Sequence, residues 1–193
     1  LLRILLGEIS PDQGTVVLGT GLQIGYFGQL REALDGDKTI AQIVGDDYDY
    51  VRLNGRDVHV LAYLRGFLFD ASRAVIPVRA LSGGERNRVV LARLFARPSN
   101  FLVLDEPTND LDVETLEVLE DQLAEYPGTL IVVSHDRMFM DNVVTSTLAF
   151  EPEGIVRRYP GGYSDWQRQG GKLAVAEGPV EDMPPPPAAA APT

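Results

Sequence analysis

Apolar and polar positions form two different patterns along this chain: wholly apolar runs, which predict buried strands, and helical periods, which predict helices. Wholly apolar runs at Phe101–Leu104 and Leu130–Val133 are typical of strands buried on both faces of a sheet. A helical period precedes the first run, over Ser82–Ala96, and another separates the two runs, over Val113–Tyr126. Strands that alternate with helices predict an α/β domain built on a parallel sheet.

Shorter segments complete the predicted domain. We expect helices at Leu1–Leu6 and Val60–Phe69, and strands at Thr15–Leu18, Leu22–Phe27, Thr147–Phe150 and Ile155–Tyr159. The composition changes after Gly170, and the run Met183–Pro187 followed by four alanines predicts a disordered tail. We therefore expect one domain over residues 1–168 and a Pro- and Ala-rich tail over residues 169–193.

The composition narrows the possible functions. Hydrophobic residues make up 45% of the chain and charged residues 23%, as in ordinary globular proteins. The absence of cysteine excludes disulfides and thiolate metal sites, and it fits a cytoplasmic location. The net charge of −11 disfavours nucleic-acid binding through bulk electrostatics, because phosphate binding needs clustered Lys and Arg. No apolar run approaches the ~20 residues that span a bilayer, so no membrane segment is expected.

The segment Leu81–Glu85 opens a helix and admits two interpretations. Ser82, with Glu85 three residues later, forms a capping-box pattern, and the structural interpretation ends there. In the functional interpretation the same helix start binds an anion, because two glycines let a ligand approach and free N–H groups face it. The segment alone does not decide between the two.

Polar residues also follow both buried strands. Asp105 and Glu106 come directly after the first strand, where Asp105 is placed to hold Mg²⁺ and Glu106 to polarise an attacking water. His135 follows the second strand, where a neutral imidazole can bond a terminal phosphate or that water. An isolated Asp-Glu pair or a lone histidine is more often structural, and we assign His59 to that class. The buried strand that leads into the pair favours the functional interpretation here.

Taken in order, five segments resemble the nucleotide-binding domain of ATP-binding cassette (ABC) proteins, a P-loop NTPase-like fold: Gln29, Leu81–Glu85, Phe101–Pro107, Asn109–Asp112 and Ser134–Asp136. The resemblance implies ATP and Mg²⁺ as ligands. It implies that Gln29 contacts Mg²⁺ and the lytic water, that Asp105 binds Mg²⁺ and that Glu106 is the catalytic base. It also implies that Asp112 is the D-loop aspartate and that His135 is the switch histidine. The signature loop, which faces the ATP of an opposing cassette, is formed by Ser82, Gly83, Gly84 and Glu85 in this resemblance.

A narrower resemblance covers roughly residues 1–168. Ser82–Arg97, Asp105–Thr115 and Ser134–Asn142 resemble the second cassette of the ABC-F family, and Val51–Ser82 is similar to its Uup-like branch. The resemblance implies a cytoplasmic, two-cassette ATPase without membrane domains, which converts ATP to ADP and phosphate. The second cassette of the same parent chain and the ribosome or branched DNA are the implied partners.

The chain departs from the family in two places. The phosphate-binding loop G-x-x-x-x-G-K-[ST] does not occur, because neither of the two lysines, Lys38 and Lys172, lies in such a sequence. An acidic tail stands where Uup-like members carry a coiled coil linked to DNA binding. We therefore expect a fragment cut just after the loop and inactive alone. Two alternatives stay open, namely the ATPase subunit of a membrane transporter and a non-enzymatic remnant.

Overall fold

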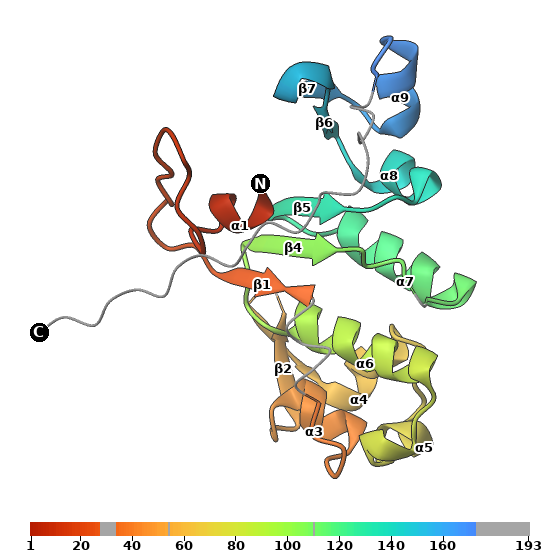
Figure 1. Ribbon diagram of the computed structural model, residues 1–193. Coiled ribbons are helices and arrows are strands. Elements are labelled where there is room, and N and C mark those ends of the chain that lie inside the picture. The colour runs from red at the N-terminus through yellow and green to blue at the C-terminus, as the bar shows by residue number, and fades with distance from the viewer. Residues whose placement is uncertain (28–33, 54, 110, 173–193) are drawn as a thin grey trace, which may run out of the picture. The chain divides into compact units, whose positions relative to one another are not determined.

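The computed structural model describes residues 1–27, 34–53, 55–109 and 111–172 (Figure 1). The chain divides into two compact units, Leu1–Val144 and Thr145–Thr193. The first unit holds the parallel sheet and the helices around it, and the second holds a hairpin followed by a helix. The residues singled out for chemistry all belong to the first unit, so the site is described within that unit.

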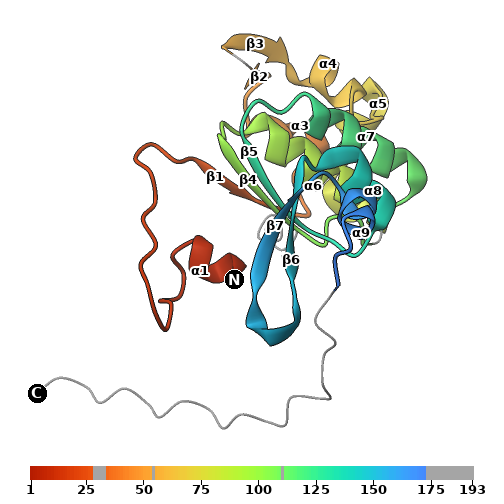
Figure 2. The same cartoon turned by 90° about the horizontal axis from the view of Figure 1, so that it is seen from above.

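Three strands of the first unit form a parallel sheet in the order β1–β4–β5. They are β1 (Ile24–Tyr26), β4 (Phe101–Asp105) and β5 (Thr129–Val133), and they lie side by side in Figures 1 and 2. The central strand β4 is fully buried at Leu102–Leu104, as its wholly apolar sequence predicts. The predicted α/β fold and both strands are confirmed, but β5 is less buried than its apolar sequence predicts. Its residues 130–132 are half-buried and Val133 is 40% exposed, because β5 ends the strand order of the described sheet.

Helix α6 (Gly83–Ala96) packs against one face of this sheet. A Cβ on Gly25 of β1 would lie 2.7 Å from the Leu102 side chain and 3.2 Å from the Leu94 side chain of α6. Only glycine fits so close an approach, because real Cβ atoms keep a greater distance from neighbouring carbons. The helix that begins at the signature loop is therefore held tightly against the strand that leads to Tyr26.

A mainly helical part lies between β1 and α6 in the sequence. Its elements are α3 (Ile40–Gly45), β2 (Tyr50–Leu53), β3 (Arg56–His59), α4 (Val60–Arg65), α5 (Ala71–Ala74) and the 3₁₀ turn η1 (Val78–Ala80). Antiparallel β2 and β3 form a hairpin, and α3 packs on α6 through fully buried side chains such as Ile40 and Leu91. His59 Nδ1 accepts the Leu61 N–H and caps α4, which agrees with its assignment to the structural class.

The other elements follow the predicted order. In the first unit they are α1 (Leu2–Leu5), α7 (Val113–Ala124) and α8 (Arg137–Val143); in the second they are β6 (Ser146–Phe150), the 3₁₀ turn η2 (Pro152–Gly154), β7 (Val156–Pro160) and α9 (Tyr163–Arg168). Each begins and ends within a few residues of the segment predicted for it, where one was predicted. None of the helices over the described residues is long and apolar enough to cross a membrane.

One predicted element is wrong, and another is shorter than predicted. Thr15–Leu18 forms no strand, and Val17 is 89% exposed, because no described segment pairs with it and a strand needs a neighbour for its backbone hydrogen bonds. The helix predicted over Val60–Phe69 ends at Arg65, and Leu68 has φ 61°, which a right-handed helix does not accommodate. The predicted tail from residue 173 onward lies outside the described residues.

Candidate functional site

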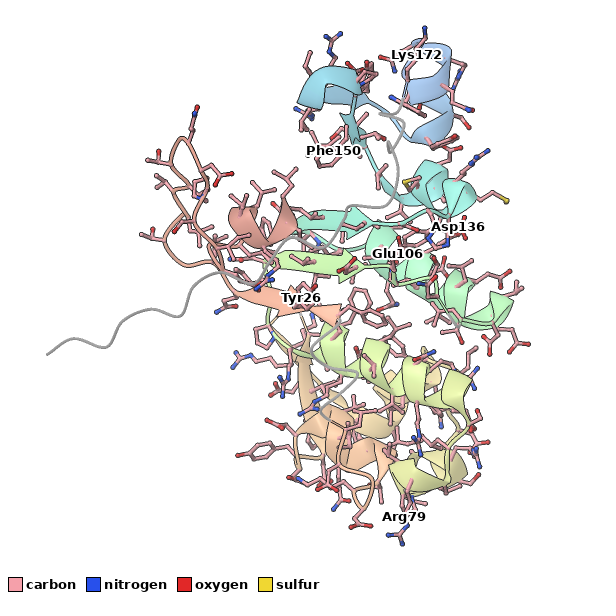
Figure 3. All side chains as sticks on the ribbon, in the orientation of Figure 1. Tyr26, Arg79, Glu106, Asp136, Phe150 and Lys172 are labelled. Atoms are coloured by element: carbon pink, nitrogen blue, oxygen red, sulfur yellow. The ribbon has the colours of Figure 1, made fainter. Side chains whose placement is uncertain are left out.

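The carboxyl ends of the parallel strands bring together side chains that are far apart in the sequence. Asp105 is in register with Val133, and the Glu106 N–H donates to the Val133 carbonyl oxygen at 2.7 Å. Glu106 and the segment after β5 therefore lie next to each other, while Tyr26 ends β1 on the other side of β4 (Figure 3). Ligands of open α/β sheets bind at this edge.

Glu106 and His135 are in contact at this edge. Glu106 Oε2 is buried and lies 2.8 Å from His135 Nδ1, within hydrogen-bond distance. Asp136, the next residue, accepts the Phe139 N–H and so caps α8, which holds the loop that carries His135. A buried carboxylate oxygen is costly unless it has a donor, and His135 Nδ1 is placed to supply one. The contact therefore holds the Glu106 carboxylate beside His135 at the strand edge.

The backbone of Glu106 has φ 45°, in the left-handed region. A residue other than glycine in such a conformation costs about 1–3 kcal/mol and persists only where its surroundings impose it. The preceding strand and the hydrogen bond to Val133 impose it here. Sequence reasoning does not supply this backbone conformation, which depends on the pairing of β4 with β5.

Asp105 has an exposed carboxylate at the end of β4. The Tyr26 hydroxyl donates to Asp105 Oδ2 at 3.3 Å, a contact that sequence reasoning missed. Burial of the phenol and the neighbouring negative charge of Asp105 raise the pKa of Tyr26. The parallel register, with Tyr26 opposite Val103, was the signal that could have identified it.

The strand edge has few metal ligands of its own. Within the described ranges, no group of three or more His, Cys, Asp or Glu residues could enclose a metal ion. A Mg²⁺ ion commonly keeps several waters and binds one or two carboxylates together with substrate phosphates, so the exposed Asp105 carboxylate fits such an ion. Gln29, the other predicted Mg²⁺ contact, lies outside the described residues.

The signature loop forms the predicted capping box at the start of α6. Ser82 Oγ accepts the Glu85 N–H at 3.3 Å, and Glu85 Oε2 accepts the Ser82 N–H at 2.9 Å. The other Glu85 oxygen pairs with Arg73, and these two interactions, with Arg73 the larger, lower the pKa of Glu85. The Glu85 carboxylate is thus engaged within the fold. Gly83 is open, since no described heavy atom beyond its neighbours lies within 4 Å of a Cβ built there.

A hollow of about 480 Å³ lies beside the start of α6. Its rim carries two cations, because Arg79 and Arg86 both line it, and Arg86 also donates to the Arg79 carbonyl oxygen at 3.2 Å. Its other lining residues are small or apolar with one amide: Leu34, Gly36, Val78, Gly83, Gly84, Asn87 and Val90. Gly83 therefore faces open space beside Arg79, which pairs with Asp37, and Arg86, whereas Gly84 lies close to a neighbouring side chain.

Asp112 links the start of α7 to the signature helix. Its Oδ1 accepts the Thr115 N–H at 2.8 Å and caps α7. Its Oδ2 lies 3.8 Å from Arg88 Nη1, and a Cβ on Gly84 would approach it to 3.1 Å. The structure thus gathers the predicted residues into two groups, one at the strand edge and one around Gly84, within the first unit.

Comparison with known proteins gives the family. Residues 1–109 match the family model described as ABC transporter. The chain belongs to this family. It is 54% identical over 169 residues to the ATP-binding protein Uup of Escherichia coli (strain K12), an alignment that covers 88% of this chain and 27% of that protein. The predicted Uup-like resemblance is confirmed, and the chain spans about a quarter of the length of this relative.

Two further similarities agree with this assignment. The chain is 41% identical over 167 residues to the energy-dependent translational throttle protein EttA of Haemophilus influenzae (strain ATCC 51907 / DSM 11121 / KW20 / Rd), which covers 86% of this chain and 30% of EttA. A solved complex of the archaeal ribosome recycling factor aABCE1 with the ribosomal stalk protein aP1 matches with a TM-score of 0.62 and 23% identity, over 87% of this chain and 33% of that chain. The latter likeness shows the fold alone.

Proposed function

We propose that this chain supplies the hydrolytic edge and the signature loop of a two-cassette ATPase that converts ATP to ADP and phosphate. The observation that carries the proposal is the placement of Asp105, Glu106 and His135 at one edge of the parallel sheet, with Glu106 Oε2 2.8 Å from His135 Nδ1. Phosphoryl transfer by positioning and charge stabilisation needs such an edge, because the protein does little covalent chemistry.

Each side chain has a distinct task in this mechanism. The Glu106 carboxylate accepts a hydrogen bond from the attacking water and draws its proton as the water approaches the γ-phosphate. His135 bonds the terminal phosphate or the same water from its exposed position beside Glu106. Asp105 holds Mg²⁺, which when bound offsets the negative charge of the phosphates. The three groups sit on adjacent strand ends and so act on one water and one phosphate.

The signature group acts on a second nucleotide in this proposal. The backbone N–H groups at the start of α6, with Ser82 and Gly84, face the terminal phosphate bound by an opposing cassette. Glu85 supports the loop as its cap partner. Asp112 contributes from the D-loop and is held beside Gly84 by the geometry described above. A P-loop lysine, which residues 1–193 lack, must come from another segment or polypeptide.

We propose that the ribosome is the target and the cytoplasm the location. The support is the similarity to EttA, a relative named as a translational throttle protein. The alternative target, branched DNA, is disfavoured for this chain by its net charge of −11. The ATPase subunit of a membrane transporter is the competing function, favoured by the description of the family model. Co-sedimentation with ribosomes or with membranes distinguishes the two.

The hydrolytic proposal is tested by restoring a phosphate-binding loop. The matched stretch of E. coli Uup is replaced by this chain, so that the preceding Uup residues supply the loop, and ATP hydrolysis is measured. We expect hydrolysis that is lost when the loop lysine of the Uup part is replaced and when Glu106 of this chain is changed to Gln. Hydrolysis that survives Glu106→Gln would overturn the assigned mechanism.

A further inference from the structure

The Asp105 carboxylate has one hydrogen-bond donor among the described residues, and it is the Tyr26 hydroxyl. Tyr26 is in register with Val103, so side-chain alternation puts Tyr26, Val103 and Asp105 on the same face of the sheet. The phenol extends along the strand direction past Val103 and reaches Oδ2 at 3.3 Å. Its aromatic ring is half-buried at the end of β1. The Tyr26–Asp105 contact therefore results from the strand register; it is not a chance contact between two mobile surface side chains.

An exposed carboxylate at a strand end rotates freely unless something holds it, because the terminal torsion of an aspartate is broad. A donor on Oδ2 fixes the plane of the carboxylate and leaves Oδ1 available to an incoming ligand. Hydrogen bonds of this kind orient the carboxylates that bind metals, and their loss typically weakens metal binding ~10–100-fold. The Tyr26 hydroxyl is in the position of such an orienting donor.

We propose that Tyr26 is a positioning residue, whose hydroxyl fixes the Asp105 carboxylate so that Oδ1 meets a divalent cation. The inference rests on the proposed role of Asp105 as the Mg²⁺ aspartate. Tyr26 itself touches neither the metal nor the nucleotide. The phenol is long enough to span the gap, and phenylalanine would keep the ring and lose only the donor.

The test uses the isolated chain and Mn²⁺ alone, so it requires neither nucleotide nor catalysis. Mn²⁺ is titrated into ¹⁵N-labelled protein, and paramagnetic broadening of the amide signals of residues 103–106 gives a site-specific affinity. The chain is compared with Tyr26→Phe and with Asp105→Asn. The matched control is Tyr159→Phe, because the Tyr159 hydroxyl donates to Glu151 in the second unit, outside the site. Amide shifts elsewhere and thermal midpoints report on the fold of each variant.

We expect Asp105→Asn to abolish the broadening, Tyr26→Phe to weaken the affinity about tenfold, and Tyr159→Phe to leave it unchanged. The thermal midpoint of Tyr26→Phe should match that of the parent. If the hydroxyl had only a structural role, a fall in Mn²⁺ affinity would be accompanied by a fall in the thermal midpoint. Unchanged Mn²⁺ affinity in Tyr26→Phe, with loss in Asp105→Asn, would overturn the inference and leave the proposed metal role of Asp105 intact. Unchanged broadening in Asp105→Asn, or no broadening at residues 103–106 of the parent chain, would instead overturn that metal role, and the inference with it.

Discussion

Replacing Glu106 by glutamine gives the sharpest test of the strand-edge chemistry. Glutamine keeps the length and one oxygen acceptor of the side chain but removes the negative charge that polarises water. The carboxylate is held in place through Oε2, which is buried and lies 2.8 Å from His135 Nδ1. General-base catalysis contributes ~10²–10⁴-fold to a rate. At about 1.36 kcal/mol for each factor of ten, the loss corresponds to about 2.7–5.4 kcal/mol of transition-state stabilisation.

The assay pairs two measurements on the protein completed with the Uup loop. Single-turnover hydrolysis of ATP reports the chemical step, and retention of nucleotide after rapid gel filtration reports binding. Glu106→Gln should hydrolyse ~10²–10⁴-fold more slowly, as a lost base predicts, and retain ATP. Asp105→Asn should differ, because loss of a Mg²⁺ ligand weakens binding of the metal–nucleotide complex itself.

Two results would refute this reasoning. Hydrolysis at the parent rate in Glu106→Gln would show that another group acts as the base. Equal loss of nucleotide retention in both variants would show that the adjacent carboxylates do not divide binding and hydrolysis between them. Circular dichroism of both variants excludes unfolding as the common cause.

Three further predictions concern the loop and its neighbours. The isolated chain should show no tight Mg-ATP binding by calorimetry, because it lacks the lysine and the nest of N–H groups that hold phosphates; a micromolar dissociation constant would contradict this. Gly83→Ala should raise the thermal midpoint, because glycine in a helix loses more conformational entropy on folding than alanine, a cost of about 0.5–1 kcal/mol. Gly84→Ala should raise it less or lower it, because the new Cβ would lie 3.1 Å from Asp112 Oδ2. Equal shifts in the two variants would exclude that crowding. Because the pKa of Glu85 is lowered from 4.5, its ionised form stabilises the fold above that pH, and the stabilisation is lost as pH falls through the lowered value. Urea midpoints of the parent and Glu85→Gln should therefore converge on acidification below about pH 4, and a constant difference would contradict the role of Arg73 and the cap.

Local sequence predicts those parts of the fold where pattern and packing agree. Phe101–Leu104 is apolar at every position, and Leu102–Leu104 are fully buried, as that pattern predicts. Leu130–Val133 is equally apolar but only partly buried, because β5 ends the strand order of the described sheet. Ser82 with Glu85 satisfies the first turn of α6 through its own side chains, so the start of that helix is encoded locally. By contrast Thr15–Leu18 has a strand pattern, but pattern alone does not supply a neighbouring strand.

The sequence groups the candidate site residues but does not give the contacts between them. Asp105, Glu106 and His135 each follow a wholly apolar run, and the tendency of parallel strands to end at a common edge is enough to group them. The 2.8 Å approach of Glu106 to His135 depends on the register of β4 and β5 and on the left-handed backbone of Glu106. The sequence does not single out Tyr26, because its hydroxyl has meaning only once β1 lies beside β4 in its observed register.

Because the backbone at Glu106 is left-handed, thermal stability and catalysis favour different amino acids at residue 106. Glycine at this residue would relax a conformation that costs other residues about 1–3 kcal/mol, and asparagine would relax part of it. Selection of random variants for survival at high temperature alone is therefore expected to reach residue 106 early and to discard the carboxylate. Selection that also demands ATP turnover would have to find its stabilising changes elsewhere, in the helices around Leu64 and Leu91 or on the surface.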